Sequence, residues 1–326
     1  MAVNASRARR AVVPIGSGRV YSLRRECGRG RNGRVRHNPC PLPARIPSAP
    51  PSITYHLPGI LSRVNAAAKK KIFAVQEYVS LSFSALRFIF ARPFYSQDLV
   101  QQMDAIGVKS LGIVVLTGFF TGMVLALQSS VQLKTFGASQ YVGSLVSASM
   151  IRELGPVLAG LMVAGRVGSG IAAELGSMKV TEQIDALNTL GTDPIKKLVT
   201  PRVLAALIMM PVLTVVADVV GIFGGNVIAA AYVGIPTEAY FRTVWEQIAS
   251  GGFTLRYIPN DFIQGLVKPF VFGGIISTIA CYFGLATTGG TEGVGLSTTR
   301  TVVAASVSIL ISDYFLTQIM LSVLGS

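Results

Sequence analysis

Several apolar runs in this chain are long enough to cross a bilayer, and this feature restricts its fold more than any other. About 20 consecutive apolar residues span the hydrocarbon core as a helix. Hydrophobic residues make up 51% of the chain and charged residues 13%, a balance typical of polytopic membrane proteins. We therefore expect an all-α integral membrane fold with about five transmembrane helices. The predicted spans are about 111–133, 142–175, 203–232, 262–286 and 301–324.

Small residues within these spans indicate how the helices pack. Gly118 and Gly122 in the first span, and Gly221 and Gly225 in the third, would let helix backbones approach closely, as small residues do in membranes. The second span is too long for the hydrocarbon core, so it should tilt, begin in the interface or kink at Pro156.

The N-terminal part has a different composition. Eleven Arg and one Glu within residues 1–50 account for +10 of the formal net charge of +14. Rich in Arg, Pro and Gly, residues 1–58 are predicted to be a disordered basic extension, and 59–326 a membrane domain. Three interpretations of 1–58 stay open: a transit peptide, a basic tail near anionic lipid or nucleic acid, or a start codon assigned too far upstream. No nucleic-acid function is assigned to the extension.

Residues 60–90 are amphipathic and aromatic, which predicts an N-terminal helix in the membrane interface. An additional span at 72–90 is the alternative. A second short helix is expected to start near Ser96. The distribution of Lys and Arg places the N-terminus and the loop around 179–197 on the cytoplasmic side. The segment 234–261, with Trp245, Phe253 and Tyr257, then faces the other side, along the membrane or against a partner.

A charged segment between the second and third spans is predicted to form a short helix from Lys179 to Leu190. Val180, Ile184 and Leu187 recur at helical spacing and make one apolar stripe. Gly191 suits the position after a helix end, and Asp193 with Pro194 suits the next helix start. The segment could rest on the lipid surface or face a cytoplasmic partner, and periodicity does not decide between the two.

The segment RELGPVLAGLMVAGRVGSGIAAELG, followed by MKVTEQIDAL, DPIKKLVTPR and a late STTRTVVAAS, closely resembles the MlaE family of permeases, which belong to ABC-type lipid transporters. The resemblance extends from about Tyr95 to the C-terminus. It implies a multi-pass protein of the bacterial inner membrane that moves phospholipid as a homodimer. It also implies three partner proteins: a cytoplasmic ABC ATPase, an MCE-type substrate-binding protein and a STAS-type subunit.

The resemblance also assigns roles to particular residues. The helix from Lys179 to Leu190 would be the coupling helix that docks into the ATPase. Glu153 and Lys268 match positions of the lipid pocket, and Arg152 is the third residue expected there. The coupling residues expected are Lys179, Glu182, Gln183, Asp185 and Leu187.

Charged residues inside spans are costly and are usually paired or line a polar pathway. Glu153 and Lys268 lie near the outer leaflet, where a lipid headgroup would pass. Arg166, Asp218 and Asp313 are interpreted as structural charges, with Arg166 paired to Asp218 or Asp313.

Several kinds of chemistry are excluded or disfavoured. The two His residues lie in the N-terminal part, so the membrane body has neither a His-based metal site nor a Ser/His/Asp triad. Cys27, Cys40 and Cys281 form no disulfide framework, and Cys281 should be buried. Without a Gly-Lys step there is no P-loop, so this chain should hold no cofactor and ATP should bind the partner. We predict no catalytic residue, and a flexible turn at Gly289–Gly295.

Three alternatives remain at this point. An ion-coupled secondary transporter would use Arg166, Asp218 and Asp313 as a relay, without an ATPase. A membrane scaffold would use the charged loop only for docking. A plastid envelope lipid permease would belong to the same class of lipid permease and would lose residues 1–58 by cleavage.

Overall fold

The computed structural model describes residues 58–88, 96–250 and 260–324, and the compact unit Leu57–Ser326 contains all of them. Every regular element among these residues is helical. Five continuous helical segments are long and apolar enough to cross a membrane. They are Ser96–Thr135, Ser139–Val180, Ile195–Val233, Asn260–Leu285 and Gly290–Val323. The predicted all-α fold with five spans is confirmed.

The first and last spans begin earlier than predicted. α2 (Ser96–Met103) continues through the π-helical turn η1 (Asp104–Val108) into α3 (Lys109–Thr135), so the short helix at Ser96 is not separate. α11 runs from Gly290 to Leu324. The flexible turn predicted at Gly289–Gly295 is therefore wrong in extent, since only Gly289 and Gly290 have positive φ values and Gly293 and Gly295 are helical.

The second span contains two π-helical turns. A 3₁₀ turn, η2 (Ser139–Tyr141), leads into α4 (Val142–Ser149), and η3 (Met150–Leu154) separates α4 from α5 (Gly155–Val163). η4 (Ala164–Gly168) then precedes α6 (Ser169–Val180). Single π turns inside α-helices frequently occur at functional sites. A kink at Pro156 was one of three alternatives for this span, and the structure has the π-helical turn η3 ending two residues before that proline.

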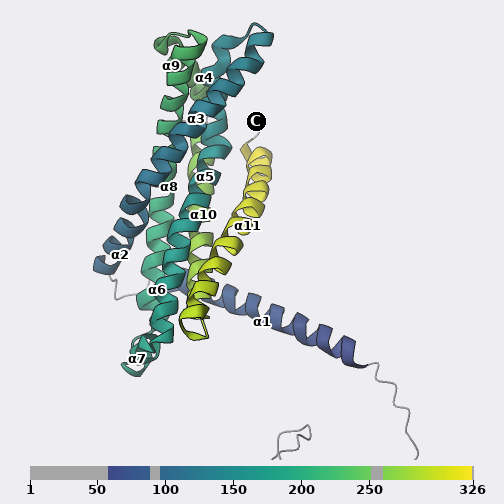
Figure 1. The fold of residues 1–326 in the computed structure, drawn as a ribbon, viewed down its shortest axis with the longest axis vertical. Coiled ribbons are helices and arrows are strands. Elements are labelled where there is room, and N and C mark those ends of the chain that lie inside the picture. The colour runs from purple at the N-terminus through teal and green to yellow at the C-terminus, as the bar shows by residue number, and fades with distance from the viewer. Residues whose placement is uncertain (1–57, 89–95, 251–259, 325–326) are drawn as a thin grey trace, which may run out of the picture. The chain divides into compact units, whose positions relative to one another are not determined.

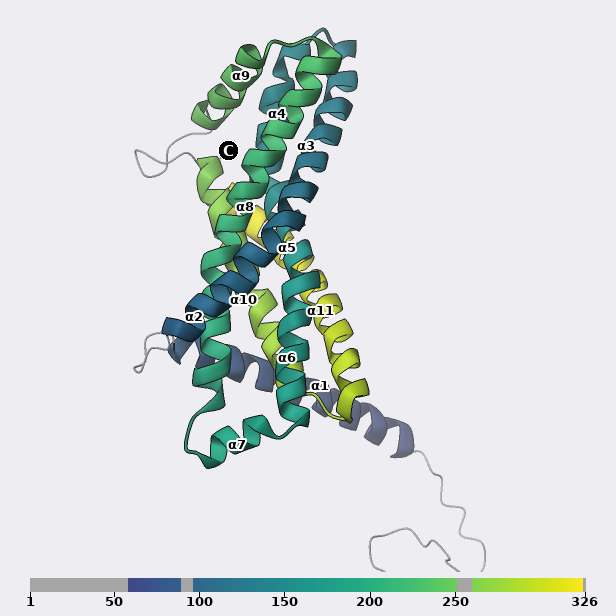
Figure 2. The ribbon, with the colours of Figure 1, turned by 60° about the vertical axis from the view of Figure 1, so that its left-hand side comes forward.

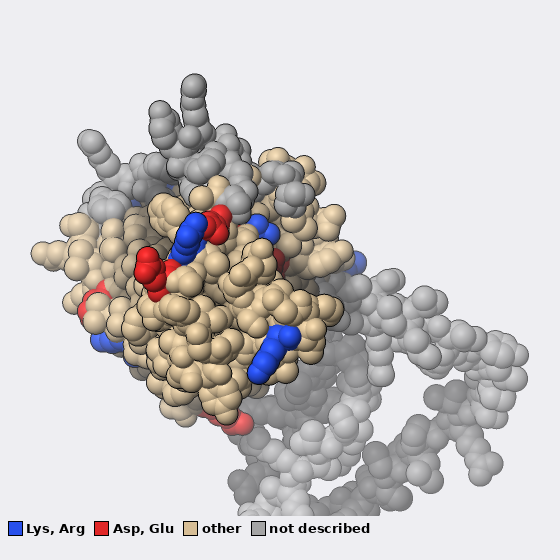
Figure 3. Space-filling model, turned by 90° about the horizontal axis from the view of Figure 1, so that it is seen from above, with Lys and Arg blue, Asp and Glu red and all other residues tan. Residues whose placement is uncertain are grey.

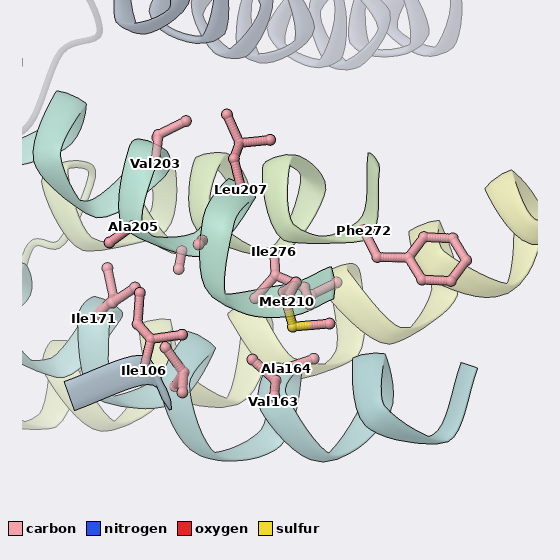
Figure 4. Close-up of a cluster of buried hydrophobic side chains, with 14 of the residues drawn as sticks. Ile106, Val163, Ala164, Ile171, Val203, Ala205, Leu207, Met210, Phe272 and Ile276 are labelled. Atoms are coloured by element: carbon pink, nitrogen blue, oxygen red, sulfur yellow. The ribbon is translucent and has the colours of Figure 1, made fainter. Parts of the chain in front are cut away.

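The third and fourth spans form the centre of the bundle. The third consists of η5 (Ile195–Val199), α8 (Thr200–Ile228) and η6 (Ala229–Val233), and the fourth is α10 (Asn260–Leu285). Buried side chains from α5, α6, α8 and α10 interlock in the main core (Figure 4). Cys281 is fully buried in this core as a free thiol, as predicted.

Glycines bring α3 and α8 into backbone contact. A Cβ at Gly118 would lie 2.8 Å from the carbonyl oxygen of Ala217, and one at Gly122 would collide with the carbonyl of Gly221. A Cβ at Gly225 would lie 2.5 Å from the Tyr240 hydroxyl oxygen. The close packing predicted from the glycine pairs is confirmed.

Two short helices mark opposite ends of the bundle. α7 (Gln183–Thr189) lies at one end, and α9 (Thr237–Ser250) packs beside α4 at the other (Figures 1 and 2). Seen from the α9 end, the described surface carries few charged side chains (Figure 3). Trp245 is exposed on α9, whereas Phe253 and Tyr257 lie outside the described residues.

α1 (Pro58–Phe88) runs transverse to the long axis of the bundle, near the α7 end (Figures 1 and 2). The Tyr78 hydroxyl is 2.9 Å from Thr278 Oγ1 on α10, and the side chains of Ile72, Val79 and Phe83 are exposed. Among the described helices, α1 is not one of the five that are long and apolar enough to cross a membrane. The helix is confirmed, and its place in the membrane interface stays a prediction. The extension predicted for 1–58 lies outside the described residues except at Pro58.

The glycine contact between α3 and α8 gives a direct test. We expect Gly122→Val to destabilise the protein by about 1–3 kcal/mol, because the added side chain forces the two backbones apart. Thermal unfolding in detergent would measure the loss. Gly112→Ala is the control, since a Cβ there meets nothing within 4 Å. Equal thermal stability of the two variants would show that α3 and α8 can accommodate a side chain at Gly122, against the prediction.

Candidate functional site

A buried lysine in α10 connects three parts of the bundle. Lys268 Nζ lies 2.8 Å from Glu153 Oε2 on η3 and 3.3 Å from Asp313 Oδ1 on α11. The same ammonium donates a hydrogen bond of 2.7 Å to the carbonyl oxygen of Arg152. The side chain of Lys268 is 0% exposed and that of Glu153 is 42% exposed. The cluster therefore joins a fully buried cation to a carboxylate that reaches the protein surface.

The Arg152 carbonyl is available to Lys268 because of the sequence around it. Pro156 follows Arg152 by four positions and has no N–H, so it cannot donate the usual helical hydrogen bond to that carbonyl. A buried ammonium needs both opposite charge and acceptors. The segment RELGP supplies an acceptor at Arg152 and a carboxylate at Glu153.

α11 completes the cluster. The Thr317 hydroxyl lies 2.9 Å from the carbonyl oxygen of Asp313 and 3.2 Å from Glu153 Oε1, and its single proton can be donated to either. The contact between Lys268 and Asp313 is an ion pair without hydrogen-bond alignment, since Asp313 Oδ1 has no hydrogen-bond partner among the described residues. Two carboxylates thus face one ammonium, and the cluster can accept a further donor.

The guanidinium of Arg152 points to a different partner. Its Nε donates a hydrogen bond of 2.8 Å to Asp261 Oδ1, at the start of α10. Of the three residues expected in the lipid pocket, Glu153 and Lys268 are brought together by their side chains. Arg152 contributes only its carbonyl oxygen. Asp261 and Thr317 were not among the residues predicted for this site, although helical spacing from Asp313 could have indicated Thr317.

The predicted pairing of Arg166 is wrong. Its Nη1 donates a hydrogen bond of 3.1 Å to Ser110 Oγ at the start of α3, and Asp313 pairs with Lys268 instead. Asp218 lies next to Gly155. Gly155 and Arg166 are eleven residues apart, or roughly 16 Å along a helix. Arg166 is therefore remote from Asp218, and it does not join Asp218 and Asp313 in the relay that a secondary transporter would need.

The loop that carries α7 differs in one respect from its prediction. Lys179 belongs to the end of α6, and a turn at Glu182, with a φ of 58°, precedes α7. The predicted single helix from Lys179 to Leu190 is therefore wrong. Lys179 Nζ lies 3.0 Å from Asp185 Oδ1, so an ion pair bridges the turn.

The ends of α7 and of the next helix are as predicted. Gly191 has a φ of 74° and its N–H donates to the carbonyl of Asn188, while the N–H of Thr192 donates to Leu187. These two bonds form a Schellman motif. Asp193 Oδ1 accepts a hydrogen bond of 2.9 Å from the Ile195 N–H.

The surface of α7 is polar and available. Glu182, Gln183 and Asp185 are exposed, Leu187 is half-buried and Ile184 is buried. The nearby Glu174 on α6 forms an ion pair of 2.9 Å with the buried Arg202 on α8, which fixes the two helices that lead into and out of the loop. The loop thus exposes acidic and amide groups between two helices that an ion pair holds together.

The described residues contain no group of three or more His, Cys, Asp or Glu side chains that could hold a metal ion.

The part of the chain that contains the polar cluster and the α7 loop is similar to known proteins. Residues 99–319 match the family model described as Permease MlaE. A probable ABC transporter permease protein from Rickettsia felis is 45% identical over 268 residues, which cover 81% of this chain and 100% of that protein. The intermembrane phospholipid transport system permease protein MlaE from Haemophilus influenzae is 39% identical, covering 68% of this chain and 82% of its own length.

A plant protein is also similar. The protein TRIGALACTOSYLDIACYLGLYCEROL 1, chloroplastic, from Arabidopsis thaliana is 38% identical over 222 residues, or 68% of this chain and 61% of the plant protein.

The polar cluster makes a stability prediction. We expect Lys268→Met to cost about 3–5 kcal/mol, because it leaves Glu153 and Asp313 without their buried counter-charge. Asp313→Asn should cost less, since Glu153 still pairs with Lys268. Thermal unfolding of the two variants in lipid nanodiscs would rank them. The reverse order would show that loss of the Lys268 charge is not the dominant cost, which contradicts the prediction.

Proposed function

Because this chain belongs to the MlaE family of ABC transporter permeases, we propose that it is the membrane subunit of a complex that transports phospholipid. In this proposal the lipid moves between the inner membrane of a bacterium and an MCE-type carrier protein on the outer side. The named function of the Haemophilus influenzae relative supports phospholipid as the substrate class.

The observation that carries the proposal is the polar cluster of Lys268, Glu153 and Asp313 inside an apolar bundle. A phospholipid headgroup contains a phosphate and often an ammonium group. Lys268 can donate to a phosphate, and the two carboxylates can accept from an ammonium. Since Lys268 is fully buried against Glu153 in this structure, a phosphate must displace Glu153 in order to reach it.

Displacement gives the site two arrangements. With Glu153 on Lys268 the site is closed, and with phosphate on Lys268 it holds a headgroup. The acyl chains would occupy apolar surface of the spans, where each buried methylene contributes about 0.8 kcal/mol. This combination favours an amphiphile over a small polar solute.

ATP would act through the exposed surface of α7. We propose that Glu182, Gln183, Asp185 and Leu187 contact a cytoplasmic ABC ATPase, with Lys179 fixing the turn through Asp185. This chain then needs no cofactor of its own and performs no hydrolysis. The N-terminus would lie on the same cytoplasmic side. A second copy of this chain would form the other half of the transport cavity, and a STAS-type subunit completes the proposed complex.

The similarity to the Arabidopsis protein supports a second candidate. The same chemistry in a plastid envelope would make the chain an organellar lipid permease. Amino-terminal sequencing of the mature protein separates the two candidates, since cleavage near residue 58 is expected only for the plastid protein.

The experiment that tests the proposal is purification of the tagged full chain from its native membranes, followed by mass spectrometry of bound proteins and lipids. We expect an ABC ATPase, an MCE-type protein and phospholipid. Recovery of functional chain without any ATPase would overturn the assignment to an ATP-driven complex.

The contact on α7 can be tested separately. Glu182→Arg should lower ATPase recovery about tenfold or more, because it reverses a charge on the proposed docking surface; a loss of ~1.4 kcal/mol already gives that factor. Glu238→Arg is the matched control, since Glu238 is exposed at the opposite end of the bundle, on α9. Undiminished recovery with Glu182→Arg would exclude this surface as the docking site.

A further inference from the structure

A second polar feature of the bundle lies in a cavity of about 170 Å³ between η3, α8, α9 and α10. Its lining is apolar except for the carboxyl group of Asp218 on α8. η3 separates this cavity from the Lys268 cluster, because Ile151 lines the cavity while Glu153 contacts Lys268. The cavity is therefore distinct from the proposed headgroup site.

Asp218 has an unused acceptor. The residue is 7% exposed, and its Oδ1 has no hydrogen-bond donor among the described residues. The cations of the neighbouring elements have other partners: Arg152 binds Asp261, and Lys268 binds Glu153. A buried carboxylate without a partner is costly. A ligand that supplies a positive donor would remove this cost.

The local sequence keeps the carboxylate of Asp218 in place. Gly155 lies against Asp218, since a Cβ at this glycine would collide with Oδ1. A buried carboxylate and an apolar wall select a ligand with a cationic donor and an apolar body.

We propose that this cavity binds the protonated amine of an amphiphile. The ammonium group lies against Asp218, and the hydrocarbon chain follows the apolar walls. Val219 and Phe262, which line the cavity, are exposed on the flank of the spans, so the ligand enters from the hydrocarbon region. A free alkylamine and the headgroup of an aminophospholipid share this chemistry. The site does not depend on the function proposed for Lys268.

The only tryptophan of the chain provides a reporter for this site. Trp245 is on α9, three residues before Ile248, which lines the cavity. The purified full chain in phosphatidylcholine nanodiscs is titrated with a nitroxide-labelled alkylamine and with the corresponding nitroxide-labelled alcohol. We expect saturable quenching of Trp245 fluorescence by the amine in excess of that by the alcohol.

Variants identify the group responsible. Asp218→Asn should raise the half-saturating concentration of the amine about tenfold, because the ammonium loses its negatively charged hydrogen-bond acceptor. Glu246→Gln is the matched control: it removes an exposed carboxylate beside Trp245 that pairs with Arg242. This variant should keep the excess quenching. Equal quenching by amine and alcohol in the unmodified chain, or an excess that survives Asp218→Asn, would overturn the proposal.

A third variant tests the cavity without changing charge. Val219→Phe keeps Asp218 and fills the wall of the cavity, so the excess quenching should fall. An undiminished excess would place the amine elsewhere and refute the site. Addition of phosphatidylethanolamine to the nanodiscs then identifies the source of the amine. Competition assigns the site to aminophospholipid headgroups, and absence of competition assigns it to free alkylamines.

Discussion

A backbone carbonyl inside a bilayer has no water to bind, so one that loses its helical donor must find another donor within the protein. This constraint explains the polar cluster. Pro156 leaves the Arg152 carbonyl without a helical donor, and the Lys268 ammonium takes its place at 2.7 Å. The buried cation then requires opposite charge, which Glu153 and Asp313 supply from two other elements. One proline thus leads, through ordinary electrostatics, to a site that connects three spans.

Features that depend on local rules could be predicted from the sequence. The length of the apolar runs indicates five spans, and Gly118 and Gly122 indicate the close contact with α8. Gly191 and Asp193 are recognisable because a left-handed residue ends a helix and an Asx side chain begins the next. Each of these predictions requires knowledge of only a few neighbouring residues or of chain length.

Pairings between distant charges could not be predicted in this way. Each π turn inserts one residue into a helix and rotates all later side chains by about 100°. Two such turns precede the end of the second span, so the direction of Arg166 relative to Asp218 cannot follow from regular helical spacing. Glu182 has the same kind of effect, because its left-handed backbone divides a helix whose apolar stripe looks continuous. Nothing in the local pattern signals either departure.

The glycine contact between α3 and α8 also limits how the bundle can change shape. No layer of side chains separates Gly122 from Gly221, so no exchange of rotamers can let these helices slide. We therefore expect the two helices to move together. α11 is the span with the smallest buried share among the five, so packing within this chain holds it less firmly than the other spans. Since α11 carries Asp313, any displacement of α11 would remove one negative charge from beside Lys268 and so change the electrostatic potential of the site.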